Sequence, residues 1–210
     1  MKRVALGLLF ICFVVSSGAQ RMDELFIKMP SDIIIQLEEA WRKDLVDLYK
    51  SGKTATLENT MQGRSGLLKL TDDYLLLQSS EHSVLEMKLL PLVNHTHIIC
   101  MITTVSAPVA DSHVCFYTTE WTPIPAEEIY TPVTADWFRK EEADRSSVAY
   151  HDAEALLDIF LVKYSLNEND FSLTAEYTTP LYLDDDSRGK IASLLKDTPR
   201  KYEWKSGRFE

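Results

Sequence analysis

Glycine and cysteine are scarce in this chain of 210 residues, which contains seven glycines and three cysteines. So few glycines leave little material for the flexible loops that surround many active sites. No serine, cysteine or histidine stands in a spacing typical of nucleophilic catalysis, and we find no low-complexity tract. After residue 15 no apolar run approaches the roughly 18 residues that a membrane-spanning helix requires. These absences argue against a recognisable enzyme and against a membrane-spanning protein.

Positive charge is also in deficit, with 22 basic against 32 acidic residues and no basic cluster. A net negative field repels phosphate backbones and anionic lipid heads. We therefore expect no nucleic-acid partner, and we predict no cofactor. A cationic partner or calcium would suit the charge, although excess acid often serves solubility alone. The apolar and charged fractions, 45% and 26%, are those of an ordinary globular protein.

The start of the chain has the pattern of an export signal. Lys2 and Arg3 precede residues 4–15, which carry no charge, and Ser17 and Ala19 then occupy the small-x-small positions that a signal peptidase reads. An apolar core of this length is too short to cross a bilayer of about 30 Å as a helix. We predict a signal peptide over residues 1–19 and a home in the periplasm or at the cell surface. An uncleaved anchor is the competing interpretation.

Cleavage at that point would leave Gln20 as the new N-terminus and a mature net charge of −12, because Lys2 and Arg3 are lost. The remaining residues 20–210 are predicted to form one α+β domain. Possible halves, residues 20–122 and 133–210, would be joined by a proline-rich linker over residues 122–132, which we expect to cross the surface. Anchoring as a lipoprotein through Cys12 is rejected, because that cysteine lies inside the apolar core.

An amphipathic helix is predicted over residues 31–50, opened by Pro30, Ser31 and Asp32 and closed by Gly52. The apolar residues that recur at helical spacing, and that we expect to be buried, are Ile34, Leu37, Trp41, Leu45 and Leu48. The charged residues between them, which we expect to face water, include Glu38, Glu39, Arg42, Lys43 and Asp47. Before this helix, Leu25, Phe26 and Met29 are expected to tuck onto the same core.

Short segments rich in β-formers follow, separated by turn residues. They lie at residues 53–61, 66–71, 74–79, 84–90, 98–105 and 114–121. Leu85, Met87 and Leu89 alternate with Glu86 and Lys88, which is typical of a strand with one wet face. Because every connection is short, we predict an antiparallel meander of about five to seven strands.

The last third of the chain mixes helices and strands. We predict a short helix after Thr134, a strongly apolar helix over residues 151–165, and a strand over residues 171–177. A helix capped by Asp186 or Ser187 and a terminal strand with Tyr202 and Trp204 complete it. The predicted fold is α+β, with the meander packed by the N-terminal helix and by C-terminal helices.

Two cysteines, Cys100 and Cys115, would survive processing, and they lie in adjacent predicted strands. Direct pairing would allow a disulfide in an oxidising compartment, whereas a one-residue difference in register would send the thiols to opposite faces. We favour two free thiols. As a nucleophile Cys100 would need exposure and a basic neighbour, and its apolar setting argues against both.

Several segments together resemble an uncharacterised family of exported proteins from Bacteroides-type Gram-negative anaerobes, a domain of unknown function. The matching residues are Leu25-Phe26-Ile27-Lys28-Met29-Pro30, Leu70-Thr71-Asp72-Asp73-Tyr74-Leu75, Leu85-Glu86-Met87-Lys88-Leu89-Leu90-Pro91, Phe116-Tyr117-Thr118-Thr119-Glu120-Trp121 and Tyr202-Glu203-Trp204-Lys205. The resemblance spans essentially the whole mature chain and implies a periplasmic or cell-surface protein. It implies no activity and no functional residues.

Two groups of polar residues have spacing that a metal site would use. His95 and His97 would share one face of a strand and could bind zinc with His113 or His82, but the adjacent residues favour a turn. The run Asp184-Asp185-Asp186 could bind calcium, although acidic residues also suit a helix N-terminus. We predict no metal site.

Two further motifs have structural explanations. Gly63-Arg64-Ser65-Gly66 lacks the spacing of a nucleophile elbow and is better explained as a hairpin loop. The four tryptophans could form a sugar-stacking platform but are as well explained by core packing; they are Trp41, Trp121, Trp137 and Trp204.

No catalytic, cofactor-binding or metal residue is predicted. The sequence favours a non-catalytic binding or interaction module of the cell envelope, with an unknown protein or envelope component as partner. The alternative is an extracytoplasmic hydrolase that acts on glycans or peptides. A pocket lined by two carboxylates, or by a nucleophile and a histidine, would favour the hydrolase.

Overall fold

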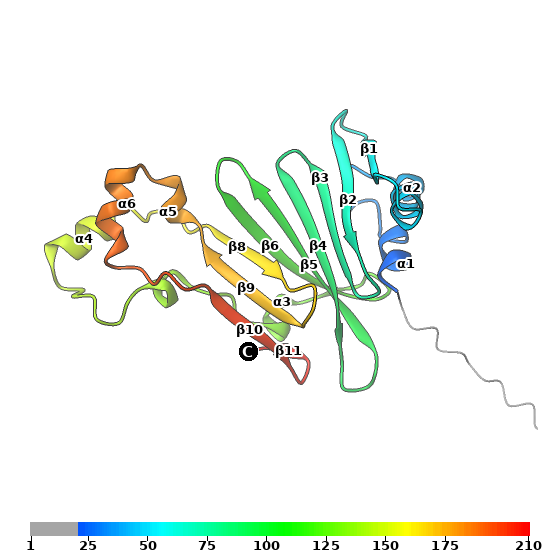
Figure 1. Cartoon of the computed structure of the whole chain (residues 1–210). Helices are drawn as coiled ribbons and strands as arrows, with labels where there is room; N and C mark the ends of the chain where they lie inside the picture. The colour runs from blue at the N-terminus through cyan, green and yellow to red at the C-terminus, as the bar shows by residue number, and fades with distance from the viewer. Residues whose placement is uncertain (1–20) are drawn as a thin grey trace, which may run out of the picture.

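The computed structural model describes residues 21–210, apart from the side chain of Ala149, and it has the predicted α+β class. The predicted signal peptide lies outside the described residues. One antiparallel sheet is a seven-stranded meander in chain order (Figure 1). Its strands are β1 (Thr56–Glu58), β2 (Arg64–Leu70), β3 (Tyr74–Ser80), β4 (Ser83–Pro91), β5 (His97–Ser106), β6 (Ala110–Thr118) and β7 (Pro123–Ile124).

The second sheet has four antiparallel strands in the order β11-β10-β9-β8. They are β8 (Val162–Leu166), β9 (Ser172–Tyr177), β10 (Arg200–Lys205) and β11 (Arg208–Phe209). The helices are α1 (Met22–Ile27), α2 (Glu39–Lys50), α3 (Ala126–Ile129), the 3-10 helix η1 (Ala135–Phe138), α4 (Val148–Glu154), α5 (Thr179–Tyr182) and α6 (Asp185–Ala192). In the described part of the chain, no helix has the length and apolar character to cross a membrane.

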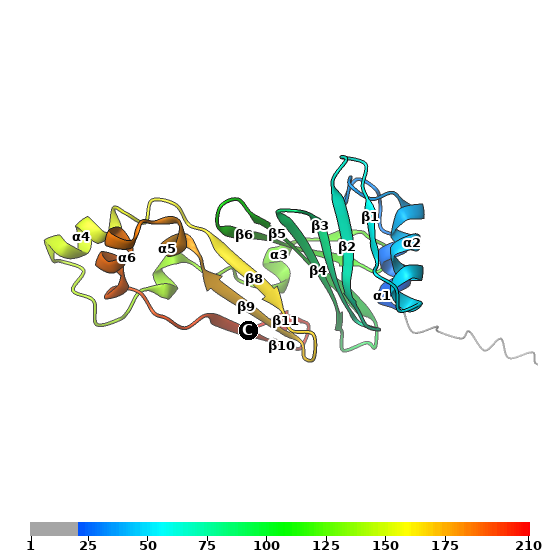
Figure 2. The ribbon, with the colours of Figure 1, turned by 45° about the horizontal axis from the view of Figure 1, so that its top comes forward.

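Both faces of the seven-stranded sheet are covered. Leu85, Met87 and Leu89 of β4 pack with α1 and α2, whereas Leu90 belongs to the core shared with the four-stranded sheet. Figure 2 shows α1 and α2 at one end of the molecule and the four-stranded sheet on the far side of the meander. The N-terminal residues Leu25 and Phe26 are buried in the first core, as predicted.

The prediction that one face of β4 is exposed to water is wrong. Glu86 and Lys88 are buried, with 8% and 1% of their surface exposed. The second sheet covers them, and both side chains find partners there. Glu86 accepts hydrogen bonds from the Leu166 amide and the Tyr74 hydroxyl, and Lys88 donates to the Glu168 carbonyl at 2.8 Å. The period-two pattern therefore predicted the strand correctly. It did not predict that Glu86 and Lys88 bind polar groups of the protein instead of water.

Side chains of the large sheet cap the edge of β8. The amides of Val162, Tyr164 and Leu166 point away from β9 and donate to Asp111, Ser112 and Glu86 at 3.0–3.1 Å. An open strand edge would expose these donors to another chain or bury them unpaired. The three acceptors instead join the two sheets along one edge.

The helix predicted over residues 31–50 begins later, at Glu39, because turns occupy the preceding residues. Trp41 is half-buried rather than central to the buried face, and Arg42, expected in water, is buried. The Arg42 guanidinium donates to the carbonyls of Ile27, Leu37 and Met29. These bonds tie the end of α1 and the following loop to α2, and burial lowers the pKa of Arg42.

The helix predicted over residues 151–165 is also wrong. Residues 148–154 form α4, and the chain then turns and enters β8 as a strand. The large apolar residues that suggested a buried helix lie in the connection after α4 and in β8. Ile159 and Phe160 in the connection are about 40% exposed, whereas Val162 is buried in the second sheet.

The segment over residues 122–132 lies partly inside the protein instead of crossing its surface. It contributes β7 to the large sheet and then α3, and Ile129 and Tyr130 are buried. Tyr130 contacts the rings of Phe116, Tyr164 and Tyr202, so it packs between the two sheets.

Candidate functional site

A pocket of about 440 Å³ lies where the end of β9 meets α5, α6 and η1. Its floor is apolar: Phe138 stacks on Tyr177 with ring centroids 5.0 Å apart, and Ile191 and Leu195 are buried beside them. Pro180 and Pro199 line its walls. The volume falls in the range of small-molecule sites, which are mostly apolar with a few polar groups.

Backbone pairing holds the floor in place. The Lys140 amide donates to the Leu194 carbonyl at 2.8 Å, and the Lys196 amide donates to the Phe138 carbonyl at 2.7 Å. These bonds join the end of η1 to the segment after α6. Phe138 is thus fixed under the pocket although it lies far from α6 in sequence.

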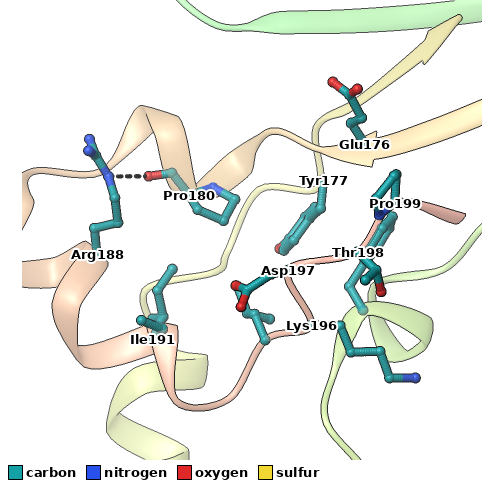
Figure 3. Close-up of a pocket in the computed structure, with 12 residues that line it drawn as sticks. Glu176, Tyr177, Pro180, Arg188, Ile191, Lys196, Asp197, Thr198 and Pro199 are labelled. Carbon is teal, nitrogen blue, oxygen red and sulfur yellow. Dashed lines mark hydrogen bonds between the residues drawn. The ribbon is translucent and has the colours of Figure 1, made fainter.

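Helices α5 and α6 form one wall of the pocket, and the N-cap of α6 and the side chain of Arg188 hold this wall in place. Asp184 accepts from the Ser187 amide at 2.9 Å and begins α6, while Arg188 donates to the carbonyls of Pro180 and Leu183. Figure 3 shows the Arg188–Pro180 bond at the pocket wall. Arg188 also forms an ion pair with Asp185 at 3.3 Å. Its charge is therefore engaged in holding the wall.

Two carboxylates line the pocket, but they differ in orientation. Figure 3 shows Asp197 beside Tyr177 toward the middle of the pocket, whereas Glu176 and Lys196 point away from it. Glu176 is 3.7 Å from Lys163, its register partner across β8 and β9. Lys196 lies 5.1 Å from the centre of the Trp137 ring. No described residue of the lining is a serine, cysteine or histidine.

The histidines considered for zinc do not form a cluster. His95 lies in the turn between β4 and β5 with a φ of 65°, and His97 begins β5. His82 lies in the turn after β3, and His113 is on β6. Across residues 21–210, no three His, Cys, Asp or Glu side chains are grouped closely enough to hold a metal ion.

The other predicted motifs have structural roles. Asp184, first of the acidic run, is the N-cap of α6. Ser65, in the motif considered for a nucleophile, is buried in β2 and donates to the Ser79 carbonyl at 2.7 Å. The hairpin loop is shorter than predicted, because Gly63 precedes β2 whereas Arg64, Ser65 and Gly66 already belong to that strand.

The two cysteines are free, as predicted. Cys115 pairs in register with Met101, and Cys100 pairs with Phe116, so the thiols lie one position out of register. Cys100 is buried in the core between the sheets, and Cys115 packs against the core under α1 and α2. Burial raises the pKa of both thiols, which argues against a reactive thiolate.

The tryptophans are dispersed. Trp41 packs on the α1–α2 core and Trp121 is buried in the turn between β6 and β7. Trp137 contacts Phe138, and the Trp204 indole donates to the Pro91 carbonyl at 2.7 Å. They do not form one platform. Sequence reasoning missed the pocket because Phe138, Tyr177 and Leu195 belong to three separate segments, and the exposed Phe160 beside them was assigned to a buried helix.

The comparisons with known proteins agree with this fold. A family model described as "Protein of unknown function (DUF3256)" matches residues 14–209. A solved structure titled "Structure of a domain of an uncharacterized protein from Porphyromonas gingivalis W83" is similar at 30% identity with a TM-score of 0.81. The match covers 90% of this chain and 97% of that one. No curated protein matches the chain. The chain therefore belongs to the family of proteins of unknown function DUF3256.

Proposed function

We propose that this protein is an exported, non-catalytic binding module of the cell envelope and that the pocket bounded by β9, α5, α6 and η1 holds its ligand. One observation carries the proposal: the pocket has an aromatic and aliphatic floor, and of its two carboxylates only Asp197 is turned toward the middle. Acid–base hydrolysis of glycans requires two carboxylates facing one bond, and acyl transfer requires an activated nucleophile. Apolar contact with few polar groups suits binding.

Export is part of the proposal and rests on the N-terminal sequence. A charged start, an uncharged core over residues 4–15 and small residues at Ser17 and Ala19 support cleavage after Ala19. Mass spectrometry of protein from its native host should find an N-terminus within about two residues of Gln20. Recovery of the full-length chain from the membrane fraction would contradict export with cleavage.

Binding is tested by filling the pocket. Ala192 lines the pocket and is exposed at the end of α6, so Ala192→Trp should occupy the cavity without disturbing the buried core. Ser193→Trp adds the same ring at the neighbouring exposed position, which does not line the pocket. Wild-type protein and Ser193→Trp should be retained by immobilised envelope fractions of the native host, and Ala192→Trp should not.

The same incubation separates binding from hydrolysis. Mass spectra of the glycan and peptide components should be unchanged by the wild-type protein. Time-dependent cleavage products that Asp197→Asn abolishes would support the hydrolase instead. Equal retention of Ala192→Trp and Ser193→Trp would show that the pocket is not the binding site.

A further inference from the structure

Exposed apolar side chains extend the pocket surface around α5. Ile159, Phe160, Leu181 and Tyr182 are 40–61% exposed, and we call these four residues the apolar shelf. The Thr179 hydroxyl donates to the Ile159 carbonyl at 2.9 Å and accepts from the Leu161 amide at 2.8 Å, so the connection before β8 lies against α5. The shelf adjoins the pocket because Phe160 contacts Tyr177 with centroids 5.4 Å apart and Pro180 belongs to α5.

The shelf adds exposed apolar side chains outside the cavity, where a ligand confined to the cavity would not reach them. Contiguous exposed apolar surface with a polar rim is typical of sites that bind other proteins. The pocket would accept one apolar side chain or a small group of them. The shelf would contact the residues on either side of it.

The charge around this surface is negative. Residues 135–161 and 178–199, which form this end of the molecule, contain 11 acidic and 6 basic side chains. Asp197 at the pocket and Asp158 next to the shelf are exposed, and within residues 21–210 neither forms an ion pair. The nearest lysine in sequence, Lys196, lies over Trp137 instead. A ligand with positive charge beside its apolar group would complement both carboxylates.

We propose that the pocket and the apolar shelf dock a segment of a partner protein in which apolar side chains are flanked by lysine or arginine. This inference rests on the proposed function and names its ligand class. Apolar groups of the segment fill the cavity over Phe138 and Tyr177, and its cations face Asp197 and Asp158. A second copy of this chain is disfavoured because the excess of acidic residues makes like chains repel, and anionic lipid is disfavoured for the same reason.

The test uses short fluorescein-labelled peptides and fluorescence anisotropy with the protein purified after expression of the full chain. The first peptide has a leucine–phenylalanine centre flanked by lysines, the second has glutamates in place of the lysines, and the third has serines in place of the apolar residues. The wild-type protein should bind the first peptide at least about tenfold more tightly than either of the others.

Substitutions test whether the first peptide binds at the pocket and the apolar shelf. Ala192→Trp should abolish binding of the first peptide, and Ser193→Trp should retain it. Asp197→Lys should weaken it by about three- to tenfold at low salt and by less at high salt, because salt screens exposed charges. Asp44→Lys makes the same charge reversal on the exposed face of α2, far from the pocket, and should leave binding unchanged.

The outcomes separate this inference from the proposed function. If the glutamate peptide binds as well as the lysine peptide, or if Asp197→Lys behaves as Asp44→Lys does, the basic partner is excluded. If no peptide binds but envelope fractions still retain the wild-type protein and not Ala192→Trp, the pocket binds another class of ligand. Concentration-dependent dimerisation that Ala192→Trp abolishes would identify a second copy as the occupant and overturn the inference.

Discussion

The seven-stranded sheet and the helical end of the molecule bury their apolar residues very differently. By the helical end we mean residues 135–161 and 178–199. The sheet is covered on both faces and contributes to two large cores. The helical end has its own small cluster, whose buried members are Ala153, Ile191 and Leu195. Its helices are short, and the apolar shelf remains exposed.

The difference indicates which region carries most of the stability and which region we propose for binding. Regions with few buried contacts open at lower free-energy cost than the core, and ligand sites are often found there. The pocket is bounded by α5 and α6, and these helices lie opposite α1 and α2 in both views (Figures 1 and 2). We infer that the two sheets form the rigid support and that the helical end presents the ligand surface.

The largest effect is expected from the core under the large sheet. Leu45 of α2 has no exposed surface, so Leu45→Ala should lower the free energy of unfolding by about 2–5 kcal/mol through lost burial and a residual cavity. Denaturant melts measure this. On the same helix Asp47 is exposed and pairs with Lys43, so Asp47→Ala should cost no more than about 0.5 kcal/mol. Equal costs would show that α2 does not pack as described.

Sequence patterns predicted the strands of the seven-stranded sheet well, but they did not predict which charged residues are buried. Short β-rich segments separated by turns were enough to place six strands of the meander, because each strand pairs with its neighbour in sequence. The burial of Glu86 could not be predicted, since its partner Leu166 lies 80 residues later. Arg42 was wrongly predicted to face water, because a sequence pattern shows its charge but not the carbonyls at the end of α1 and in the following loop that accept its hydrogen bonds.

At the helical end the sequence pattern itself was interpreted as the wrong type of element. A high density of apolar residues over 151–165 suggested one buried helix, although Val162, Tyr164 and Leu166 alternate with polar residues at strand spacing. The pocket could not be predicted at all. It exists because the backbone of residues 138–140 pairs with that of 194–196, a contact that leaves no periodic signal.

The two cysteines lie on the paired strands β5 and β6, and they differ in exposure: one thiol is in the core and the other is partly exposed. After unfolding without reductant, both Cys100 and Cys115 should react with a thiol reagent, because their register keeps them apart. In the folded protein Cys115 is partly exposed and Cys100 fully buried, so Cys115 should react first, by roughly tenfold or more. Labelling followed by peptide mapping measures both. Labelling that appears only after a reductant is added would reveal a disulfide.

The junction between the two sheets should respond to pH through Glu86. Burial raises the pKa of this carboxyl above its ordinary value of 4.5. The unfolded chain therefore releases this proton at lower pH than the folded protein, so the contribution of Glu86 to stability falls as pH rises above about 4.5 and levels off above the raised pKa. Glu86→Gln keeps an acceptor for the Leu166 amide but cannot ionise.

Thermal or denaturant melts of wild type and Glu86→Gln across this pH range isolate the effect. The stability of the variant relative to wild type should rise with pH. Glu176→Gln removes an exposed carboxylate of β9, in the four-stranded sheet, and should show a nearly flat difference. A relative stability of Glu86→Gln that falls with pH would mean that the ionised carboxylate is favoured by its partners, contrary to the burial argument.

The smallest effect on stability is expected on the shelf, where it bears most directly on function. Leu181→Ala is the same substitution as Leu45→Ala, but Leu181 is 61% exposed and should lower the free energy of unfolding by less than about 0.5 kcal/mol. If the shelf is a docking surface, this variant should nevertheless weaken binding of the lysine-flanked apolar peptide, because a contact residue is lost while the fold remains. Denaturant melts and anisotropy titrations on the same preparation give both values. A large loss of stability would mean that α5 is packed more tightly than its exposure indicates, and unchanged binding would remove Leu181 from the contact surface.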